Sequence, residues 1–140
     1  MDGVALIEKW EGFRAQAYKC PAGVWTYGYG STTKPDGTPV KKGDTITKAK
    51  AEALLVDYLN KNVRPKLSGL RLKPCQIAAI ESIVYNVGPG FFRSNCFKGI
   101  QEKDWGKVYN NWDWIKANGK VLNGLIRRRS EELALFFSEL

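Results

Sequence analysis

A stretch near the N-terminus, from Glu11 to Gly30, contains residue types that can do acid–base chemistry. Glu11 is its only carboxylate. The polar side chains that could act beside it are Tyr18, Cys20, Thr26, Tyr27 and Tyr29. A carboxylic acid can donate a proton to a leaving group, whereas a hydroxyl or a thiol can orient a water molecule or act as a nucleophile. We therefore take this stretch as the candidate active-site segment.

The chain has no histidine, which excludes several kinds of catalytic machinery. It cannot build a Ser-His-Asp or Cys-His site, or a zinc site that contains histidine. Its three cysteines, Cys20, Cys75 and Cys96, are an odd number without Cys-x-x-Cys spacing, which argues against a disulfide framework and a zinc knuckle. We expect no metal, no cofactor, at least one free thiol, and buried structural positions for Cys75 and Cys96.

Two short elements are expected to position the segment. Apolar residues recur at helical spacing over residues 3–12, which predicts a helix with Glu11 near its end. A solvated charge at a helix end is the competing interpretation of Glu11. Residues 18–20 and 25–29 are β-prone runs separated by a turn, which predicts a hairpin.

Alternation along the second strand separates its residues into two faces. Thr26, Gly28 and Gly30 share the face on which a ligand could lie against the backbone, because the glycines have no side chains. The aromatic residues on the other face are Trp25, Tyr27 and Tyr29. The alternative is that the aromatics form a small core and the glycines only bulge.

The rest of the chain is predicted to be mainly helical. Thr47 can cap a helix of about five turns that would join the β-region to a separate helical lobe. A second helix starts at Pro74 and ends before a Gly-Pro-Gly sequence. Asp104 can cap a further short helix. Residues 116–120 are predicted to form a loop, and the last helix covers residues 122–137.

Helical phase predicts which charges of these helices are buried. In the last helix Arg129 falls in the middle of the apolar face, so it must have a buried partner. That face consists of Leu122, Leu125, Ile126, Leu133, Phe136 and Phe137. Arg127 and Arg128 are predicted to be surface charges paired with the glutamates four residues later. We interpret Glu81, beside the apolar stripe of its helix, as a structural ion-pair partner.

Length and composition favour one globular domain with anionic partners. The chain has 140 residues, 44% of them hydrophobic, and a net charge of +8. A non-catalytic module that binds wall glycan or nucleic acid is therefore a competing hypothesis. Apolar runs are far shorter than the roughly 20 residues that span a bilayer, and the N-terminus lacks the pattern of a signal peptide. We expect no stable membrane insertion.

Four features of the sequence resemble the phage-type lysozymes, also called endolysins or muramidases, of glycoside hydrolase family 24. Glu11, Cys20 and Thr26 match the family's active-site spacing, with Cys20 in place of the commoner aspartate. The other similar segments are Trp25 to Gly30, Tyr85 to Gly88 and Gly124 to Glu132. The similarity covers nearly the whole chain.

The resemblance implies an α+β, mainly helical, lysozyme-like fold, with a single domain over residues 1–140. A β-containing lobe over about residues 12–60 would be joined by a long helix to a helical lobe. The helical lobe would comprise about residues 66–140 and the N-terminal helix. The implied reaction is hydrolysis of the β-1,4 bond between N-acetylmuramic acid and N-acetylglucosamine in a peptidoglycan strand. A lytic transglycosylase that acts on the same bond is the alternative.

The resemblance also implies roles for individual residues. Glu11 would be the general acid, with Cys20 and Thr26 on the other side of the sugar, and Arg129 would be the partner of Glu11. Whether Cys20 positions water, ionises or attacks the sugar stays open. The implied substrate-binding residues are Tyr29, Gly30 and Ser31, and the implied supporting residues include Tyr18 and Asn86. No nucleic acid partner is expected.

The resemblance further implies where the protein acts. The family's holin-dependent members reach the wall only through a membrane lesion. We expect a monomer that accumulates in the cytoplasm of the producing bacterial cell. It would act on the cell wall after the membrane is permeabilised.

Overall fold

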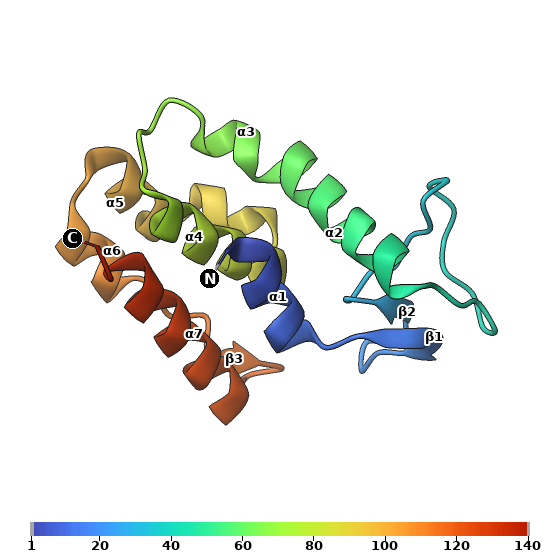
Figure 1. Ribbon diagram of the computed structural model, residues 1–140. Coiled ribbons are helices and arrows are strands. Elements are labelled where there is room, and N and C mark those ends of the chain that lie inside the picture. Colours follow the sequence, from blue (N-terminus) through green and yellow to red (C-terminus); the bar gives the residue numbers. More distant parts are fainter. Residues whose placement is uncertain (1, 140) are drawn as a thin grey trace.

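Helices account for most of the structure, a computed structural model that describes residues 2–139 (Figure 1). The helices are α1 (Gly3–Glu11), α2 (Lys48–Asn62), α3 (Arg64–Leu67), α4 (Pro74–Val87), the 3₁₀ helix η1 (Pro89–Arg93), α5 (Asn95–Glu102), α6 (Trp105–Asn110) and α7 (Asn123–Phe136). The strands are β1 (Arg14–Lys19), β2 (Trp25–Gly28), β3 (Lys116–Ala117) and β4 (Lys120–Val121). β1 pairs antiparallel with β2, and β3 with β4. The predicted mainly helical α+β fold with a small N-terminal hairpin is confirmed.

Side-chain caps determine where several helices begin. Asp2, Thr47 and Asp104 each accept a hydrogen bond from the N–H three residues later, at the starts of α1, α2 and α6. Each such cap satisfies a free N–H of the first turn and stabilises the helix by about 1 kcal/mol. Pro74 begins α4, and Gly88 ends it with a φ of 97°, a conformation that favours glycine. The predicted caps at Thr47 and Asp104 and the helix start at Pro74 are confirmed.

Helix α2 is shorter than predicted, and it covers part of the β1–β2 hairpin. It has 15 residues, so it is about 22 Å long, and α3 begins directly after Val63 with Pro65 in its first turn. A Cβ atom on Gly28 would lie 3.0 Å from the Cβ of Ala51, so β2 packs directly on α2. The expectation that Gly28 offers open backbone to a ligand is wrong, because α2 occupies that space.

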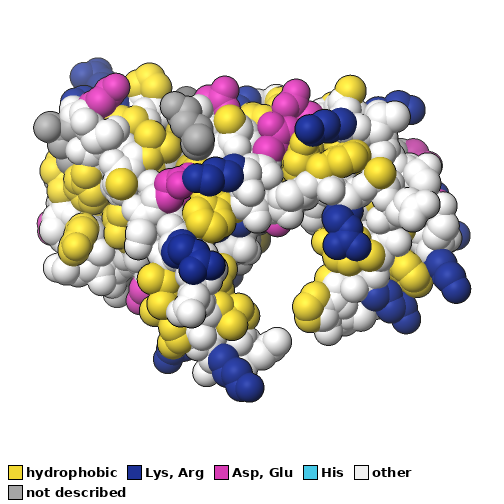
Figure 2. Space-filling model, turned by 60° about the horizontal axis from the view of Figure 1, so that its bottom comes forward, with side chains coloured by type: hydrophobic (Ala, Val, Ile, Leu, Met, Phe, Trp, Pro, Cys, Tyr) yellow, Lys and Arg dark blue, Asp and Glu magenta, His cyan; other side chains and the backbone are white. Residues whose placement is uncertain are grey.

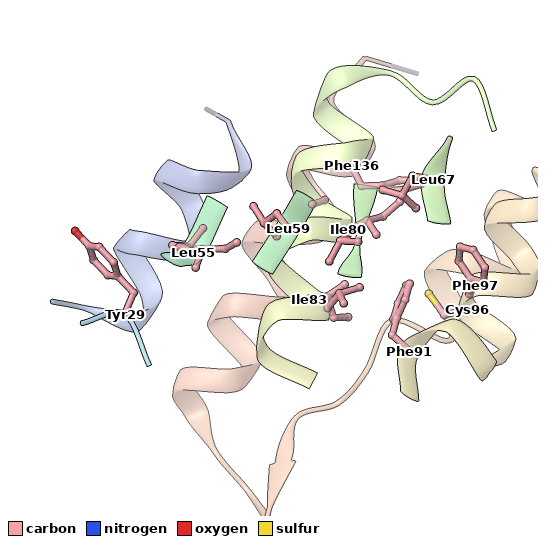
Figure 3. Close-up of a cluster of buried hydrophobic side chains, with 14 of the residues drawn as sticks. Tyr29, Leu55, Leu59, Leu67, Ile80, Ile83, Phe91, Cys96, Phe97 and Phe136 are labelled. Carbon is pink, nitrogen blue, oxygen red and sulfur yellow. The ribbon is translucent and has the colours of Figure 1, made fainter. Parts of the chain in front are cut away.

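A continuous apolar core joins the hairpin to the helices (Figure 3). It extends from Tyr29 past Leu55 and Leu59 of α2 and Ile80 of α4 to the side chain of Phe91. Burying one such side chain contributes about 1.5–3 kcal/mol. Helix α4 packs against both α1 and α7. The helix that carries Glu11 and the helix that carries the three arginines are therefore held by the same neighbour.

The C-terminal part of the chain departs from the predictions in two places. Residues 116–120 form the β3–β4 hairpin rather than a loop. Its turn residues Asn118 and Gly119 have φ values of 53° and 76°, as in the two-residue turns that Asn-Gly favours. Leu122 and Ile126, which were expected to be buried, are 43% and 38% exposed. Leu122 directly precedes α7, and Ile126 lies in its first turn.

Two predictions about buried polar groups are confirmed. Cys75 and Cys96 are buried, and all three cysteines are free. Glu81 is 3% exposed, and its Oε2 lies 2.7 Å from Nε of Arg64. A Cβ atom on Gly3 would lie 2.1 Å from Oε1 of Glu81. A side chain at position 3 would therefore displace this carboxylate.

The contact between α1 and α2 predicts a dependence of stability on pH. Burial and the neighbouring Glu52 raise the pKa of Glu8. An acid whose pKa is raised in the folded state binds more protons there than in the unfolded state. Stability therefore falls as pH rises from the unfolded-state pKa through the folded-state pKa. We expect Glu52→Gln to raise the melting temperature more at pH 7 than at pH 4. Thermal unfolding at both pH values tests this, with Glu102→Gln on the surface as the control; equal gains at both would contradict the prediction.

Candidate active site

Glu11 is the last residue of α1, and its two carboxylate oxygens have different surroundings. Gly12 ends the helix with a φ of 71°, which directs the chain into β1. Oε2 of Glu11 accepts a hydrogen bond from Nη1 of Arg128 at 2.7 Å. Oε1 faces the hairpin, since a Cβ atom on Gly30 would lie 3.3 Å from it. The side chain of Glu11 keeps 21% exposure, so the carboxylate is held on one side and accessible on the other.

Arg128 is the buried cation that binds Glu11. Its side chain is only 5% exposed. Nη2 donates to the carbonyl of Ser82 at 3.1 Å, and Nε lies 3.3 Å from both the Ser82 hydroxyl and Oε2 of Glu132. All three guanidinium nitrogens are therefore engaged. A guanidinium bound in this way has a fixed orientation, because its donors lie in one rigid plane.

Arg129 pairs with Glu132 rather than with Glu11, so the predicted partner of Glu11 is wrong. Nη2 of Arg129 donates to Oε2 of Glu132 at 3.0 Å, and Nε lies 2.7 Å from Oε1. Arg129 is buried and paired as predicted. Arg128 is not the surface charge that was expected, although its predicted pairing with Glu132 is present.

Arg129 was predicted in place of Arg128 because the buried face of the last helix was placed wrongly around its axis. The apolar face used for the prediction included Leu122 and Ile126, which are exposed. The buried face of α7 instead extends toward α1 and α4, where Arg128 and Glu132 lie one turn apart. A glutamate four residues after an arginine was the available signal, but it is also typical of a surface ion pair.

Cys20 and Thr26 lie together near the turn of the β1–β2 hairpin. Cys20 directly follows β1, and Thr26 pairs with Tyr18 across the hairpin. The N–H of Cys20 donates to the carbonyl of Val24 at 3.0 Å, which closes the turn. The Thr26 hydroxyl donates to the same carbonyl, also at 3.0 Å. Because its proton is used in this way, the hydroxyl oxygen of Thr26 is left as an acceptor.

The surroundings of Cys20 favour its thiolate. The N–H groups of Val24 and Ala22 stabilise the ionised sulfur and lower the pKa of Cys20. In contrast, burial raises the pKa of Cys96 to about 12. Thiol chemistry is therefore expected at Cys20 rather than at Cys96.

The segment from Tyr29 to Ser31 leads from β2 toward the opening beside Glu11. Tyr29 is 2% exposed, so its ring belongs to the core, while Gly30 is exposed. Ser31 exchanges two backbone hydrogen bonds with Tyr27 at 2.9 and 3.0 Å. Of the three predicted substrate-binding residues, Gly30 and Ser31 have accessible atoms.

Tyr85 lines the groove beside the candidate site, although the sequence predicted no role for it. Its hydroxyl donates to the carbonyl of Tyr29 at 2.7 Å, which ties α4 to the hairpin. Burial, together with the charge of Glu11, raises the pKa of Tyr85. The neighbouring Asn86, predicted as a supporting residue, is exposed at the end of α4. Tyr18, the other supporting residue, is half-buried under the guanidinium of Arg14, 4.3 Å from the ring centre.

A groove of about 460 Å³ begins at Gly30 and Ser31. Its wall includes Tyr58 and Tyr85, whose rings meet edge to face at 5.3 Å. The charged groups on its lining include Lys34, Asp57 and Lys61. Aromatic surfaces combined with a few polar groups suit a polyhydroxylated ligand, which has both C–H faces and hydrogen-bonding edges.

The space-filling view shows a deep notch between two arms of the molecule (Figure 2). They correspond to the β3–β4 hairpin and the β1–β2 hairpin of Figure 1. The end of α1, where Glu11 lies, is between them in Figure 1. An extended polymer can enter such an open notch without threading an end.

Comparison with known proteins identifies the family. The family model described as phage lysozyme matches residues 8–132. The chain belongs to the phage lysozyme family. An endolysin of Acyrthosiphon pisum secondary endosymbiont phage 1 is 37% identical over 97% of this chain and 95% of its own length. The endolysin of Salmonella phage P22 is 31% identical over 98% of this chain and 96% of its own.

The solved structures agree with this assignment. The endolysin from Escherichia coli O157:H7 phage FAHEc1 superposes with a TM-score of 0.84 at 28% identity, covering 99% of this chain and 92% of that one. The enzyme is thus a glycoside hydrolase, a peptidoglycan-lysing muramidase. Among residues 2–139, no helix has the length and apolar character needed to cross a membrane.

Proposed function

We propose that Glu11 is the general acid that protonates the leaving oxygen of the β-1,4 bond between N-acetylmuramic acid and N-acetylglucosamine. The observation that carries this proposal is the asymmetric environment of its carboxylate. Arg128 holds Oε2, and Oε1 faces Gly30 at the accessible side. A proton donor must be fixed within hydrogen-bond reach of the bond that breaks.

Cys20 and Thr26 are proposed to hold the attacking water on the opposite side of the sugar. The acceptor oxygen of Thr26 and the thiolate-favouring surroundings of Cys20 support this role. A water molecule between these groups and the sugar gives an inverting displacement. Gly30 and Ser31 are proposed to bind the sugar through the groove, and Tyr29 contributes its backbone rather than its buried ring.

The glycan strand is proposed to lie between the β-containing lobe, about residues 12–60, and the helical lobe, about residues 66–140 with the N-terminal helix. The protein would act as a monomer that neither binds nucleic acid nor inserts stably into a membrane. Burial of two of the three consecutive arginines supports the absence of a nucleic acid surface there. The protein would collect in the cytoplasm of the producing cell and reach the wall after permeabilisation, which cell fractionation before and after lysis tests.

Mass spectrometry of digested peptidoglycan tests the proposed reaction. Hydrolysis at this bond leaves fragments with reducing muramic acid ends. A lytic transglycosylase would leave anhydro ends instead, since an intramolecular nucleophile replaces water. Fragments with reducing glucosamine ends, or anhydro ends alone, would contradict the proposal.

The role of Cys20 predicts thiol-dependent activity. Iodoacetamide at neutral pH should label Cys20 before Cys75 and Cys96, because only Cys20 is accessible with a lowered pKa. We expect lysis of purified peptidoglycan to fall as the label is incorporated. Cys20→Asp should retain or raise activity, since a carboxylate orients water better than a thiol, and it should resist the reagent. An inactive Cys20→Asp variant with the parent's circular dichroism would contradict the water-positioning role.

A further inference from the structure

Glu132 is a wholly buried carboxylate behind the candidate site, on the side of Arg128 that faces away from Glu11. Its Oε2 accepts from the Ser82 hydroxyl at 2.5 Å and from Nη2 of Arg129 at 3.0 Å. Nε of Arg128 lies 3.3 Å from the same oxygen. Trp112 Nε1 donates to Oε1 at 3.3 Å. One carboxylate thus organises side chains from α4, α7 and the segment after α6.

Glu11, Arg128, Arg129 and Glu132 form a cluster of two positive and two negative charges. Arg128 and Arg129 are adjacent in the chain and buried, and they face Glu132 and Glu11. Without Glu132, two buried guanidinium groups would be left with the single partially exposed carboxylate of Glu11. A buried charge that loses its partner is strongly unfavourable, so the arginines would have to move.

Exposure increases along the chain of contacts toward the accessible side. The side chains of Glu132, Arg128 and Glu11 are 0%, 5% and 21% exposed, respectively. Glu11 and Arg128 each form an ion pair with a more buried member of this series. Arg128 links the two carboxylates, because it contacts both of them.

We infer that Glu132 is a positioning residue for the reaction, which holds Arg128 from behind so that Nη1 fixes the direction of the Glu11 carboxylate. This inference rests on the proposed function of Glu11 as the acid. Glu132 lies outside the groove that is proposed to bind the sugar. Its loss should therefore slow the chemical step and leave substrate binding nearly unchanged.

The kinetic test uses Glu132→Gln, which keeps the shape but removes the charge, with Glu131→Gln as the matched control. Glu131 is the neighbouring residue, and it pairs with Lys9 near the surface. On purified peptidoglycan we expect Glu132→Gln to lower kcat at least about 10-fold and to change KM less than about 2-fold, as misplacement of a catalytic group does. The alkaline limb of the kcat profile should move to lower pH. Once Glu132 is neutral, the two arginines carry an uncompensated positive charge, which favours the ionised form of the catalytic acid. Glu131→Gln should keep the parent values.

A second test measures the coupling between Glu11 and Glu132 from unfolding free energies and needs no activity assay. Glu11 and Glu132 both contact Arg128. The unfolding free energies of Glu11→Gln, Glu132→Gln and the double variant should therefore depart from additivity, as coupled residues do. If Glu132→Gln does not fold, Ser82→Ala replaces it in both tests, since it removes only the hydroxyl between Arg128 and Glu132.

The possible results separate this inference from the proposed function. A folded Glu132→Gln or Ser82→Ala variant with the parent's kcat and pH profile, a loss confined to KM, or additive unfolding energies would each overturn the inference. The role of Glu11 would survive these results if Glu11→Gln were inactive. A fully active Glu11→Gln variant would overturn the proposed function, and the coupling in stability would still report whether Glu132 orders the cluster.

Discussion

Glu11→Gln is expected to abolish lysis of purified peptidoglycan while the protein stays folded. Glutamine keeps an oxygen that can accept from Nη1 of Arg128. It cannot donate an acidic proton to the leaving oxygen, and general acid catalysis typically contributes a factor of about 10²–10⁴. We therefore expect at least a 100-fold loss of kcat, about the lower end of that range. Turbidity loss of a wall suspension measures it, and circular dichroism checks the fold.

Glu8→Gln is the matched control for this experiment. It makes the same chemical change one turn earlier on α1, away from Arg128. It should retain the parent's rate, because Glu8 interacts with Glu52 and Tyr29 rather than with Arg128. Parental lysis by a folded Glu11→Gln variant would remove Glu11 from the mechanism.

Arg128→Met is expected to lower stability much more than the same substitution at the neighbouring Arg127. The substitution leaves Glu132 buried with one fewer partner and frees Glu11 from its ion pair. Removing one partner of a buried ion pair typically costs about 3–5 kcal/mol. Urea unfolding should show this decrease in the unfolding free energy, and lysis should fall as well because the Glu11 carboxylate is no longer held.

Arg127→Met provides the internal comparison. Arg127 is exposed at the preceding position of the same helix. Surface substitutions of this kind usually change stability by less than about 0.5 kcal/mol. Arg128→Lys should give an intermediate result, since a lysine keeps the charge but cannot engage three acceptors in one plane. Equal effects at positions 127 and 128 would contradict the buried role of Arg128.

The local elements of the site were predictable because each depends on a pattern of residues that are close together in the chain. Helical spacing places Glu11 at the end of α1, and the turn between two β-prone runs brings Cys20 close to Thr26. The caps at Thr47 and Asp104 each depend on one hydrogen bond between residues three positions apart. Contacts of this range depend little on how the distant parts of the chain pack.

The partner of Glu11 was not predictable in the same way. Arg128 and Arg129 differ by one residue, 100° around the helix, so small errors in the position of the buried face exchange them. The packing of α1 and α4 against α7 decides which arginine reaches Glu11. Likewise, the approach of α2 decides that Gly28 is covered while Gly30 stays exposed.

The sequence by itself determined the family, the mainly helical fold, and the segment from Glu11 to Thr26 in which we propose the chemistry. The tertiary structure alone decided that Arg128 holds Glu11, that Glu132 orders both arginines, and that Tyr85 ties α4 to the hairpin. The physical reason is the range of the interactions. Helix ends and turns form between residues a few positions apart, whereas the Glu11–Arg128 pair joins residues 117 positions apart and exists only when α1, α4 and α7 are packed together.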